Sequence, residues 1–279
     1  RVASWNVQSF SAGKARNHEL LNQIAEKMKN FDLVAVQEIS NVREKSDPDC
    51  PRNTECPKAK NCGVIREALD EQLNDNQDDN YGITISPQVR HERYMYVYDK
   101  DQVQLLDHRL VHDPGDSAPV CAYRPENTGT MVRQPFLGVF QADDFSFAML
   151  NVHVAPKQAN AEIDALLDFQ DRLREEGYSD VIVAGDLNAD CRYLSQKQQD
   201  ELATSEHHWL FRGADTAVAE SRECGYDQMI ATRPTLEDLT GKLGVAGPVD
   251  EKVSDHFPIW ANFYIHRDTD RHDISKLSD

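Results

Sequence analysis

Short apolar runs recur along the whole chain, and this recurrence limits the possible folds more than any other feature of the sequence. They are rich in β-branched and aromatic residues, as strands are, and lie at residues 1–7, 31–38, 93–99, 136–140, 145–154, 180–186, 226–231 and 257–265. Helical periodicity separates some of them at residues 18–30 and 160–177, and Gly177 is placed to end the second helix. Residues 136–150 indicate a hairpin across a polar turn, so we expect mixed sheets in a layered α/β sandwich.

The length and composition favour one large globular domain. The chain has 279 residues, of which 39% are apolar, and its mean hydropathy is −0.65. No apolar run approaches the roughly 20 residues that span a bilayer, so we expect no membrane segment. A strand-like run opens the sequence, and we expect any signal peptide to have been removed before it. Residues 43–62 form a polar, Cys-bearing insertion, and residues 112–130 a long loop near the working face.

The charge balance is strongly acidic. Thirty Lys and Arg residues stand against 48 Asp and Glu residues, a formal net charge of −18. Such a field repels nucleic acids and anionic membranes unless local basic side chains or bound cations reverse it. Two explanations stay open at this point: an acidic surface that keeps the protein soluble in high salt, and carboxylates gathered to bind divalent cations.

The six cysteines indicate an oxidising compartment. Four of them lie in or near polar, Pro-rich segments, at Cys50, Cys56, Cys62 and Cys121. The five-residue gaps between the first three differ from the short C-x-x-C spacing of zinc sites, so disulfides are favoured over a metal. The pairing among these four stays open. We therefore expect a secreted, extracellular or periplasmic protein.

Polar side chains follow the apolar runs in several places. They are Asn6, Glu38, His153, Asp186, Asn188, Asp255 and His256. Taken singly, each has an ordinary structural explanation, such as a hydrogen-bonded histidine, a turn residue or a helix cap. Carboxylates that share one crevice repel one another unless a cation neutralises them, so their recurrence indicates a metal site. Oxygen donors from Glu38, Asp186, Asn188 and Asp255 suit Mg²⁺, Mn²⁺ or Ca²⁺ better than Zn²⁺.

A set of motifs resembles a known family. SWNV, VQEIS, HERY, NVHVAP, GDLNADC, CGYDQM and SDHFP occur in the order and approximate spacing of the endonuclease/exonuclease/phosphatase superfamily, and most closely of its deoxyribonuclease I-like members. The resemblance covers residues 1 to about 264 and implies a single catalytic domain there, with residues 265–279 as a polar tail or linker. It implies a four-layered α/β sandwich with two packed mixed β-sheets flanked by helices. It also implies a disulfide between Cys191 and Cys224, which supports secretion.

The resemblance assigns roles to the histidines and their carboxylates. His153 and His256 are similar to the general acid and base pair that flanks the scissile phosphate. Glu92 and Asp227 are similar to the carboxylates that orient these histidines. In-line attack by water on a phosphodiester needs such a base, a proton for the leaving oxygen and positive charge for the phosphorane.

The resemblance also implies how cations are bound. Glu38 and Asp255 are similar to the ligands of one cation, and Asp186 and Asn188 either bind a second cation or contact the phosphate. We expect Mg²⁺ or Mn²⁺, with Ca²⁺ as a further candidate. The family's structural calcium loop keeps only Asp215 and Thr216 here, which puts calcium at that loop in doubt.

Substrate contacts follow the family less closely. The resemblance implies that Asn6 holds the phosphate or Glu38, and that Arg133 contacts a DNA phosphate. Arg90 replaces a minor-groove tyrosine, Ser40 an arginine after the metal-binding Glu, and Gln8 another arginine. We count Arg90 among the substrate-binding residues and expect different groove contacts.

These observations favour a secreted, metal-dependent endonuclease that hydrolyses double-stranded DNA with little sequence specificity. We expect a salt-tolerant monomer, and a separate DNA-binding module in a longer parent chain would suit its acidic charge. The alternative is a phosphodiesterase or phosphatase of the same superfamily that acts on a phospholipid, an inositol phosphate or abasic DNA. A non-enzymatic binding protein is disfavoured, because both histidines and all candidate ligands are present.

Overall fold

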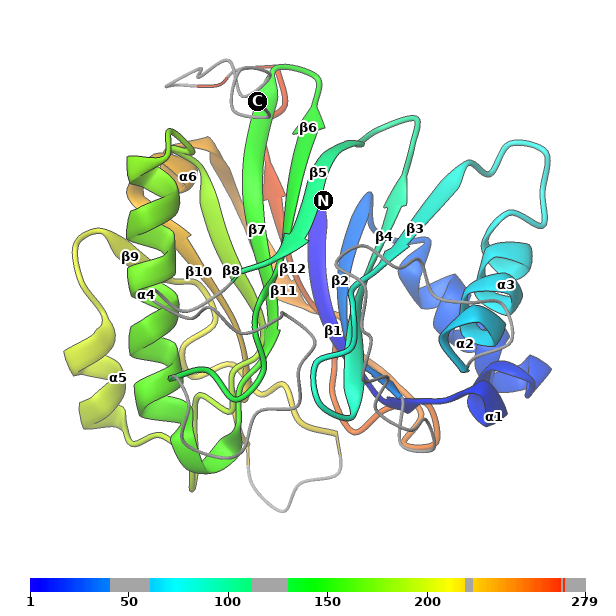
Figure 1. The fold of residues 1–279 in the computed structure, drawn as a ribbon, viewed down its shortest axis with the longest axis horizontal. Coiled ribbons are helices and arrows are strands. Elements are labelled where there is room, and N and C mark those ends of the chain that lie inside the picture. Colours follow the sequence, from blue (N-terminus) through cyan, green and yellow to red (C-terminus); the bar gives the residue numbers. More distant parts are fainter. Residues whose placement is uncertain (41–60, 112–129, 219–222, 267, 269–279) are drawn as a thin grey trace.

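Two β-sheets lie face to face in the computed structural model, which describes residues 1–40, 61–111, 130–218, 223–266 and 268 (Figure 1). Within these residues each sheet has six strands. The first has the order β11 (Leu239–Val245), β12 (Ile259–Phe263), β1 (Val2–Phe10), β2 (Leu33–Ser40), β4 (Glu92–Asp99), β3 (Tyr81–Ile85). The second has the order β5 (Gln104–Leu110), β6 (Phe136–Ala142), β7 (Phe145–His153), β8 (Val181–Asp186), β10 (Asp227–Thr232), β9 (His207–Trp209).

Both sheets are mixed, as the sequence predicts. The pairs β1–β2 and β7–β8 are parallel, and the other paired strands of the described part are antiparallel, including the predicted β6–β7 hairpin. A parallel pair needs a crossover connection. Helix α2 (His18–Met28) supplies it for β1–β2, and α4 (Ala159–Glu175), entered through a 3-10 turn at Pro156–Gln158, supplies it for β7–β8. The expected sandwich is thus confirmed.

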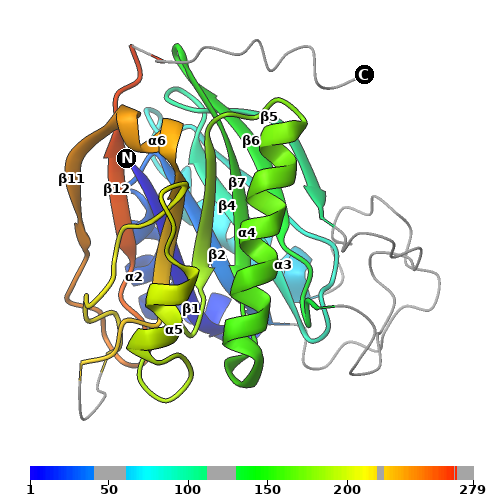
Figure 2. The same ribbon diagram turned by 90° about the vertical axis from the view of Figure 1, so that its left-hand side faces the viewer.

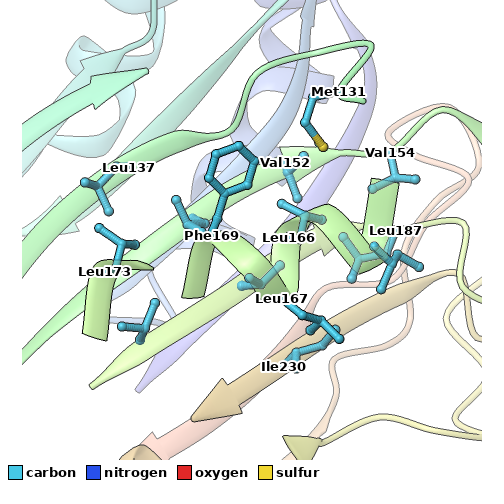
Figure 3. Close-up of a cluster of buried hydrophobic side chains, with 14 of the residues drawn as sticks. Met131, Leu137, Val152, Val154, Leu166, Leu167, Phe169, Leu173, Leu187 and Ile230 are labelled. Carbon is cyan, nitrogen blue, oxygen red and sulfur yellow. The ribbon is translucent and has the colours of Figure 1, made fainter. Parts of the chain in front are cut away.

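Helices cover both outer faces of the sheet pair (Figures 1 and 2). One face carries α1 (Ala12–Ala15), α2 and α3 (Asn61–Leu73), and the other carries α4 and α5 (Gln196–Leu202), while the short α6 (Arg233–Asp238) follows β10. One apolar cluster fills the space between the sheets, and a second joins the first sheet to α1–α3. Figure 3 shows part of the third cluster, where Leu166, Phe169 and Leu173 of α4 pack on the second sheet.

The two predicted helices are confirmed and have identifiable ends. The Asn17 side chain caps α2 by accepting a hydrogen bond from the Leu20 amide. Helix α4 stops at Glu175, and Gly177 follows with φ of 104°, a left-handed conformation that glycine adopts without a Cβ clash. Both helices end about two residues before the predicted limits, as fraying ends do. None of the helices in the described ranges has the length and apolarity needed to cross a bilayer.

Three of the predicted polar segments fall mainly outside the described residues. Of the predicted insertion at 43–62, residues 43–60 are not described, and its last two residues are the start of α3. Cys62 is fully buried and disulfide-bonded. Cys50, Cys56 and Cys121 lie outside the described residues, as do residues 112–129 of the predicted loop and most of the predicted tail.

Candidate active site

Strand register brings several of the predicted site residues onto neighbouring positions. The parallel pair β7–β8 sets His153 opposite Asp186, and the antiparallel pair β8–β10 sets Asp186 opposite Asp227. Residues directly opposite one another in adjacent strands project from the same side of a sheet. His153, Asp186 and Asp227 therefore form one row across the second sheet. The row faces the first sheet, whose β4 begins with Glu92.

Two imidazoles approach a single carboxylate oxygen in this row. His153 Nε2 lies 3.4 Å from Asp186 Oδ2, and His256 Nε2 lies 3.5 Å from the same oxygen. Behind them, His153 Nδ1 is 3.1 Å from both Glu92 oxygens, and His256 Nδ1 is 2.7 Å from Asp227 Oδ2. Each Nδ1 thus faces its own carboxylate, which fixes the ring orientation and leaves Nε2 directed into the site.

Charge in this buried cluster shifts the pKa values. Burial alone would lower the pKa of His256, but the charges of Asp227 and Asp186 outweigh it and raise the pKa to about 10. His153 is affected in the same way: burial opposes its charge, but Glu92 raises the pKa above its usual range. Burial favours the neutral form of Asp186, yet the two histidines hold the pKa of this carboxyl below its usual value. The surrounding carboxylates therefore favour the protonated form of both imidazoles.

Asn6 links the two sheets at the site. Its Nδ2 donates to Glu38 Oε1 at 3.0 Å and to Asp186 Oδ2 at 3.1 Å, while its Oδ1 accepts from the Gln8 amide at 2.9 Å. The Ser9 amide donates to the other Glu38 oxygen at 2.7 Å. Both Glu38 oxygens are thereby oriented by fixed donors. Asn6 is predicted to hold either the phosphate or Glu38, and the contact with Glu38 is present in the structure.

Oxygen donors for a cation lie around Asp186. The Asn188 amide N–H donates to Asp186 Oδ1 at 3.0 Å, and Asp255 Oδ1 lies 3.8 Å from His256 Nε2. Asp186, Asp227 and His256 also have ligand atoms within 4.8 Å of one another. In that trio, however, His256 Nδ1 is already hydrogen-bonded to Asp227. This contact orients the imidazole for proton transfer and occupies the nitrogen. The carboxylate and amide oxygens of Glu38, Asp186, Asn188 and Asp255 are the better match for a hard cation.

Arg133 is held by groups of the site itself. Its Nε lies 2.5 Å from Glu92 Oε1 and donates to the His153 carbonyl at 2.9 Å. The side chain is largely buried, with 14% of it exposed. Arg133 therefore braces the Glu92–His153 pair, a task that the sequence does not reveal, in addition to the predicted contact with a DNA phosphate.

A pocket of about 210 Å³ opens beside His153 and Arg133. Ser40 and Arg90 line it, so two of the three positions that depart from the family lie on its wall. Arg90 sits in a tight turn with φ of 60°, uncommon for a residue other than glycine. Three residues are predicted to bind substrate, and all lie around His153. Asn6 contacts Glu38 and Asp186, Arg133 contacts Glu92 and the His153 carbonyl, and Arg90 lines the pocket.

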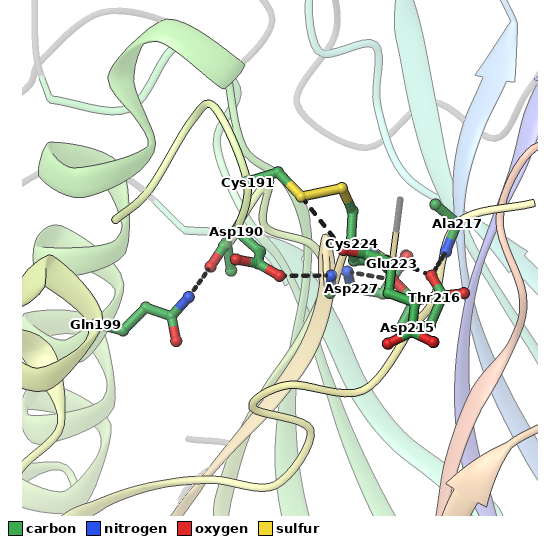
Figure 4. The surroundings of a disulfide bond; sticks show 11 residues. Asp190, Cys191, Gln199, Asp215, Thr216, Ala217, Glu223, Cys224 and Asp227 are labelled. Atoms are coloured by element: carbon green, nitrogen blue, oxygen red, sulfur yellow. Dashed lines mark hydrogen bonds between the residues drawn. A yellow bond between two sulfur atoms is a disulfide. The ribbon is translucent and has the colours of Figure 1, made fainter. Parts of the chain in front are cut away.

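A disulfide secures the loop that leads to Asp227 (Figure 4). Cys191 and Cys224 are bonded, with their Cα atoms 5.7 Å apart, and the Asp227 amide donates to Thr216 Oγ1 at 3.1 Å. Asp215 Oδ1 accepts a hydrogen bond from the Cys224 amide at 3.1 Å. At the position of the family's calcium loop, the Asp215 carboxylate therefore accepts hydrogen bonds from main-chain amides.

Several residues that support the site were not predicted. The His256 loop is tied to β1 by Trp5, whose Nε1 donates to the His256 carbonyl at 3.0 Å, and by Ser254, whose hydroxyl donates to the Asn6 carbonyl at 2.6 Å. Glu162 is buried, and its carboxylate accepts hydrogen bonds from the Val132 amide at 3.3 Å and the Ala155 amide at 3.2 Å. Val132 is the residue before Arg133. The only sequence signal for Glu162 is an acidic residue on the apolar face of a helix.

The sandwich and its paired imidazoles define a hydrolytic enzyme that acts on phosphodiester bonds. The model of the Endonuclease/Exonuclease/phosphatase family matches residues 3–256, almost all of the described core. The chain belongs to this family.

Named relatives cover nearly the whole chain. Human Deoxyribonuclease-1-like 2 is 30% identical, with 96% of this chain and 93% of the relative covered. Rabbit (Oryctolagus cuniculus) Deoxyribonuclease-1 is 27% identical, with 93% and 90% covered. Among solved structures, a family protein from Bacteroides thetaiotaomicron has a TM-score of 0.64 at 16% identity, with 97% of each chain covered. Zebrafish (D. rerio) TDP2, complexed with single strand DNA product, has a TM-score of 0.58 at 13% identity, with 94% and 98% covered. These two structures support the fold.

Proposed function

We propose that the protein is a secreted, divalent-metal-dependent endonuclease that hydrolyses double-stranded DNA with little sequence specificity. The observation that carries this proposal is the pair of imidazoles, each backed by a carboxylate, that meet at Asp186 Oδ2. The deoxyribonuclease names of the relatives support DNA as the substrate.

The two histidines act as the proton-transfer groups. Their Nε2 atoms face one another across Asp186, so a phosphate placed there has one imidazole on each side. The imidazole that is neutral accepts the proton of the attacking water, and the other, in its cationic form, donates a proton to the leaving oxygen. Glu92 and Asp227 keep the rings oriented and stabilise their charged forms.

Glu38 and Asp255 would hold one cation, and Asp186 and Asn188 would hold a second or contact the phosphate. The donor set fits such an ion, because it consists of carboxylate and amide oxygens and the lowered pKa keeps Asp186 charged. A bound Mg²⁺ or Mn²⁺ would supply positive charge for the phosphorane, and Ca²⁺ is a further candidate.

A few side chains around His153 bind the DNA backbone. Arg133 and Arg90 place positive charge at the pocket, which opposes the repulsion expected of a protein with a net charge of −18. Asn6 assists by keeping Glu38 in place. Because Arg90 takes the place of a groove-binding tyrosine, the groove contacts are this chain's own.

Secretion or export to the periplasm agrees with the Cys191–Cys224 disulfide, since such bonds persist in oxidising compartments. We further propose that the active unit is a monomer formed by residues 1–264, with residues 265–279 as a tail or linker. A separate DNA-binding module in a longer parent chain would offset the acidic charge.

Incubation with supercoiled plasmid tests this function. With Mg²⁺ we expect nicking and then fragmentation, both abolished by EDTA and restored by Mg²⁺ or Mn²⁺. His153→Ala should lower the nicking rate by ~10² or more with the fold intact, because one proton-transfer group is lost. His266→Ala is the matched control, since His266 is exposed and pairs with Asp143. Intact plasmid with the wild-type protein would contradict the proposal and direct attention to phospholipid, inositol phosphate or abasic substrates.

A further inference from the structure

Main-chain carbonyls from two loops, the curled end of β1 and the loop before β12, enclose the ammonium group of Lys14 at the edge of the candidate active site. Lys14 belongs to α1, directly after β1, and its Nζ donates to the carbonyls of Val7 at 3.2 Å, Gln8 at 2.5 Å and Val253 at 2.9 Å. An ammonium group has three N–H donors, and these carbonyls use all three. The half-buried charge is thus engaged by the backbone and is not offered to a DNA phosphate.

The first of these loops positions Glu38. Gln8 and Ser9 have φ values of 29° and 49°, so the end of β1 curls out of the extended conformation. The curl turns the Ser9 amide toward Glu38 Oε2, 2.7 Å away, and turns the carbonyls of Val7 and Gln8 toward Lys14. Such backbone is strained and persists only where its surroundings hold it.

The second loop carries Asp255. Val253, which accepts the third Lys14 N–H, lies two residues before this carboxylate. The loop also has other anchors: the Ser254 hydroxyl donates to the Asn6 carbonyl, Trp5 Nε1 donates to the His256 carbonyl, and the Asp255 carbonyl accepts from the Val218 amide at 2.7 Å. Lys14 is the charged link between the loop that orients Glu38 and the loop that carries Asp255.

The charge of Lys14 and its geometry make opposite predictions for a cation. Glu38 and Asp255 both lie close enough to act on the ammonium group and to oppose the lowering of its pKa by burial. By charge alone, Lys14 repels a cation bound by these carboxylates, so its removal would strengthen cation binding. By geometry, its removal frees the two loops and weakens cation binding.

We propose that Lys14 is a positioning residue that fixes Asp255 relative to Glu38 and thereby sets the cation affinity of the site. The inference rests on the proposed function, because it takes these two carboxylates as ligands. Lys14 itself contacts neither the cation nor the substrate; it acts through the two loops.

Binding of Mn²⁺ alone to the full chain, followed by paramagnetic resonance or calorimetry, tests the inference. Lys14→Met should weaken Mn²⁺ binding about tenfold, the size typical of lost support around a metal ligand. The Mg²⁺ concentration that gives half-maximal nicking should rise by the same factor, with kcat restored at saturating Mg²⁺. Lys27→Met is the matched control, because Lys27 Nζ donates to the Pro248 carbonyl at 3.0 Å, five residues before Val253. Its Mn²⁺ affinity should equal that of the wild type.

Lys14→Arg decides the question if the Met variant does not fold. Arginine keeps the charge but cannot point three donors from one nitrogen at three carbonyls, so we expect weaker Mn²⁺ binding here too. Unchanged or tighter binding in either folded variant would overturn the inference. Failure of wild-type protein to nick plasmid would instead overturn the proposed function, and the Mn²⁺ titration would still measure the role of Lys14.

Discussion

At the scale of single residues, the site is organised around one buried carboxylate. Asp186 is 3% exposed, and its two oxygens meet Asn6, the Asn188 amide and both imidazoles. A carboxylate so placed stabilises positive charge on both sides at once. Protonation of one histidine therefore depends on the charge of the other, because both act on the same oxygen.

Replacing Asp227 by Asn tests the charge coupling at His256. The variant keeps the shape of the side chain but removes the charge that contributes most to raising the pKa of His256 to about 10. Burial remains, so this pKa should fall toward or below its ordinary value of 6.5. An NMR titration of the imidazole in the metal-free protein measures the change. Continued protonation of His256 above about pH 9 in Asp227→Asn would contradict this account.

The same shift affects stability in a defined pH range. A histidine whose pKa is higher in the folded than in the unfolded state stabilises the fold fully below the unfolded pKa, near 6.5, and this contribution is lost as the pH rises through about 10. The metal-free protein should therefore lose unfolding free energy across that range. Urea unfolding at several pH values should show a smaller loss in Asp227→Asn.

Which residues gather at the site was partly predictable from the sequence. Glu38, His153 and Asp186 stand at strand ends inside motifs, so their recurrence marks them. Lys14 and Trp5 act on main-chain carbonyls far away in the sequence, and no residue pattern encodes such a contact. The bracing of Glu92 by Arg133 was not predictable either, because it depends on how two loops meet.

At the scale of elements, the contact between β7 and β8 depends on a glycine. A Cβ on Gly185 would lie 1.8 Å from the Val152 carbonyl oxygen, which is backbone and has no rotamer to change. Val152 and Gly185 are the pair directly before His153 and Asp186. The two strands can therefore approach this closely only with glycine at position 185.

Gly185→Ala should accordingly damage both stability and activity. We expect a loss of roughly 1–3 kcal/mol of unfolding free energy from the forced separation, and a nicking rate lower by ~10² because the two site residues shift. Urea unfolding and plasmid nicking measure these effects. Gly13→Ala in α1 is the control, since its Cβ would meet Ser11 Oγ at an ordinary 3.5 Å. Wild-type values for Gly185→Ala would show that the strands can move apart freely.

Prediction of elements succeeded for inner strands and failed at the sheet edges. Every inner strand of the described sheets was expected, whereas β3, β5, β9 and β11, the four edge strands, were not. An inner strand is buried on both faces and forms a dense apolar run. An edge strand such as β5 alternates exposed and half-buried side chains and includes Asp107, His108 and Arg109, so its sequence is typical of a loop.

At the scale of the whole molecule, the acidic charge predicts a shallow response to salt. Each phosphate neutralised by a basic side chain contributes roughly −0.9 to the slope of log affinity against log salt, so Arg90 and Arg133 together give a slope of about −2. We expect nicking to persist at about 0.5 M NaCl, several times physiological ionic strength. Plasmid assays across a salt series measure the slope. Loss of activity by about 0.5 M NaCl, or a slope steeper than about −5, would contradict this.

The origin of the site residues in both sheets bears on how the protein is made. Glu38 and Glu92 come from the first sheet and His153 and Asp186 from the second, while His256 lies near the C-terminal end of the sandwich. A ribosome-bound chain has no complete site until residue 256 has left the exit tunnel and β12 has joined β1. Nascent molecules, proteolytic halves and chains with one sheet unfolded should all be unable to cut DNA. Expressed separately and mixed, two complementary fragments would regain cleavage only by assembling both sheets, which makes nuclease activity a reporter of the completed fold.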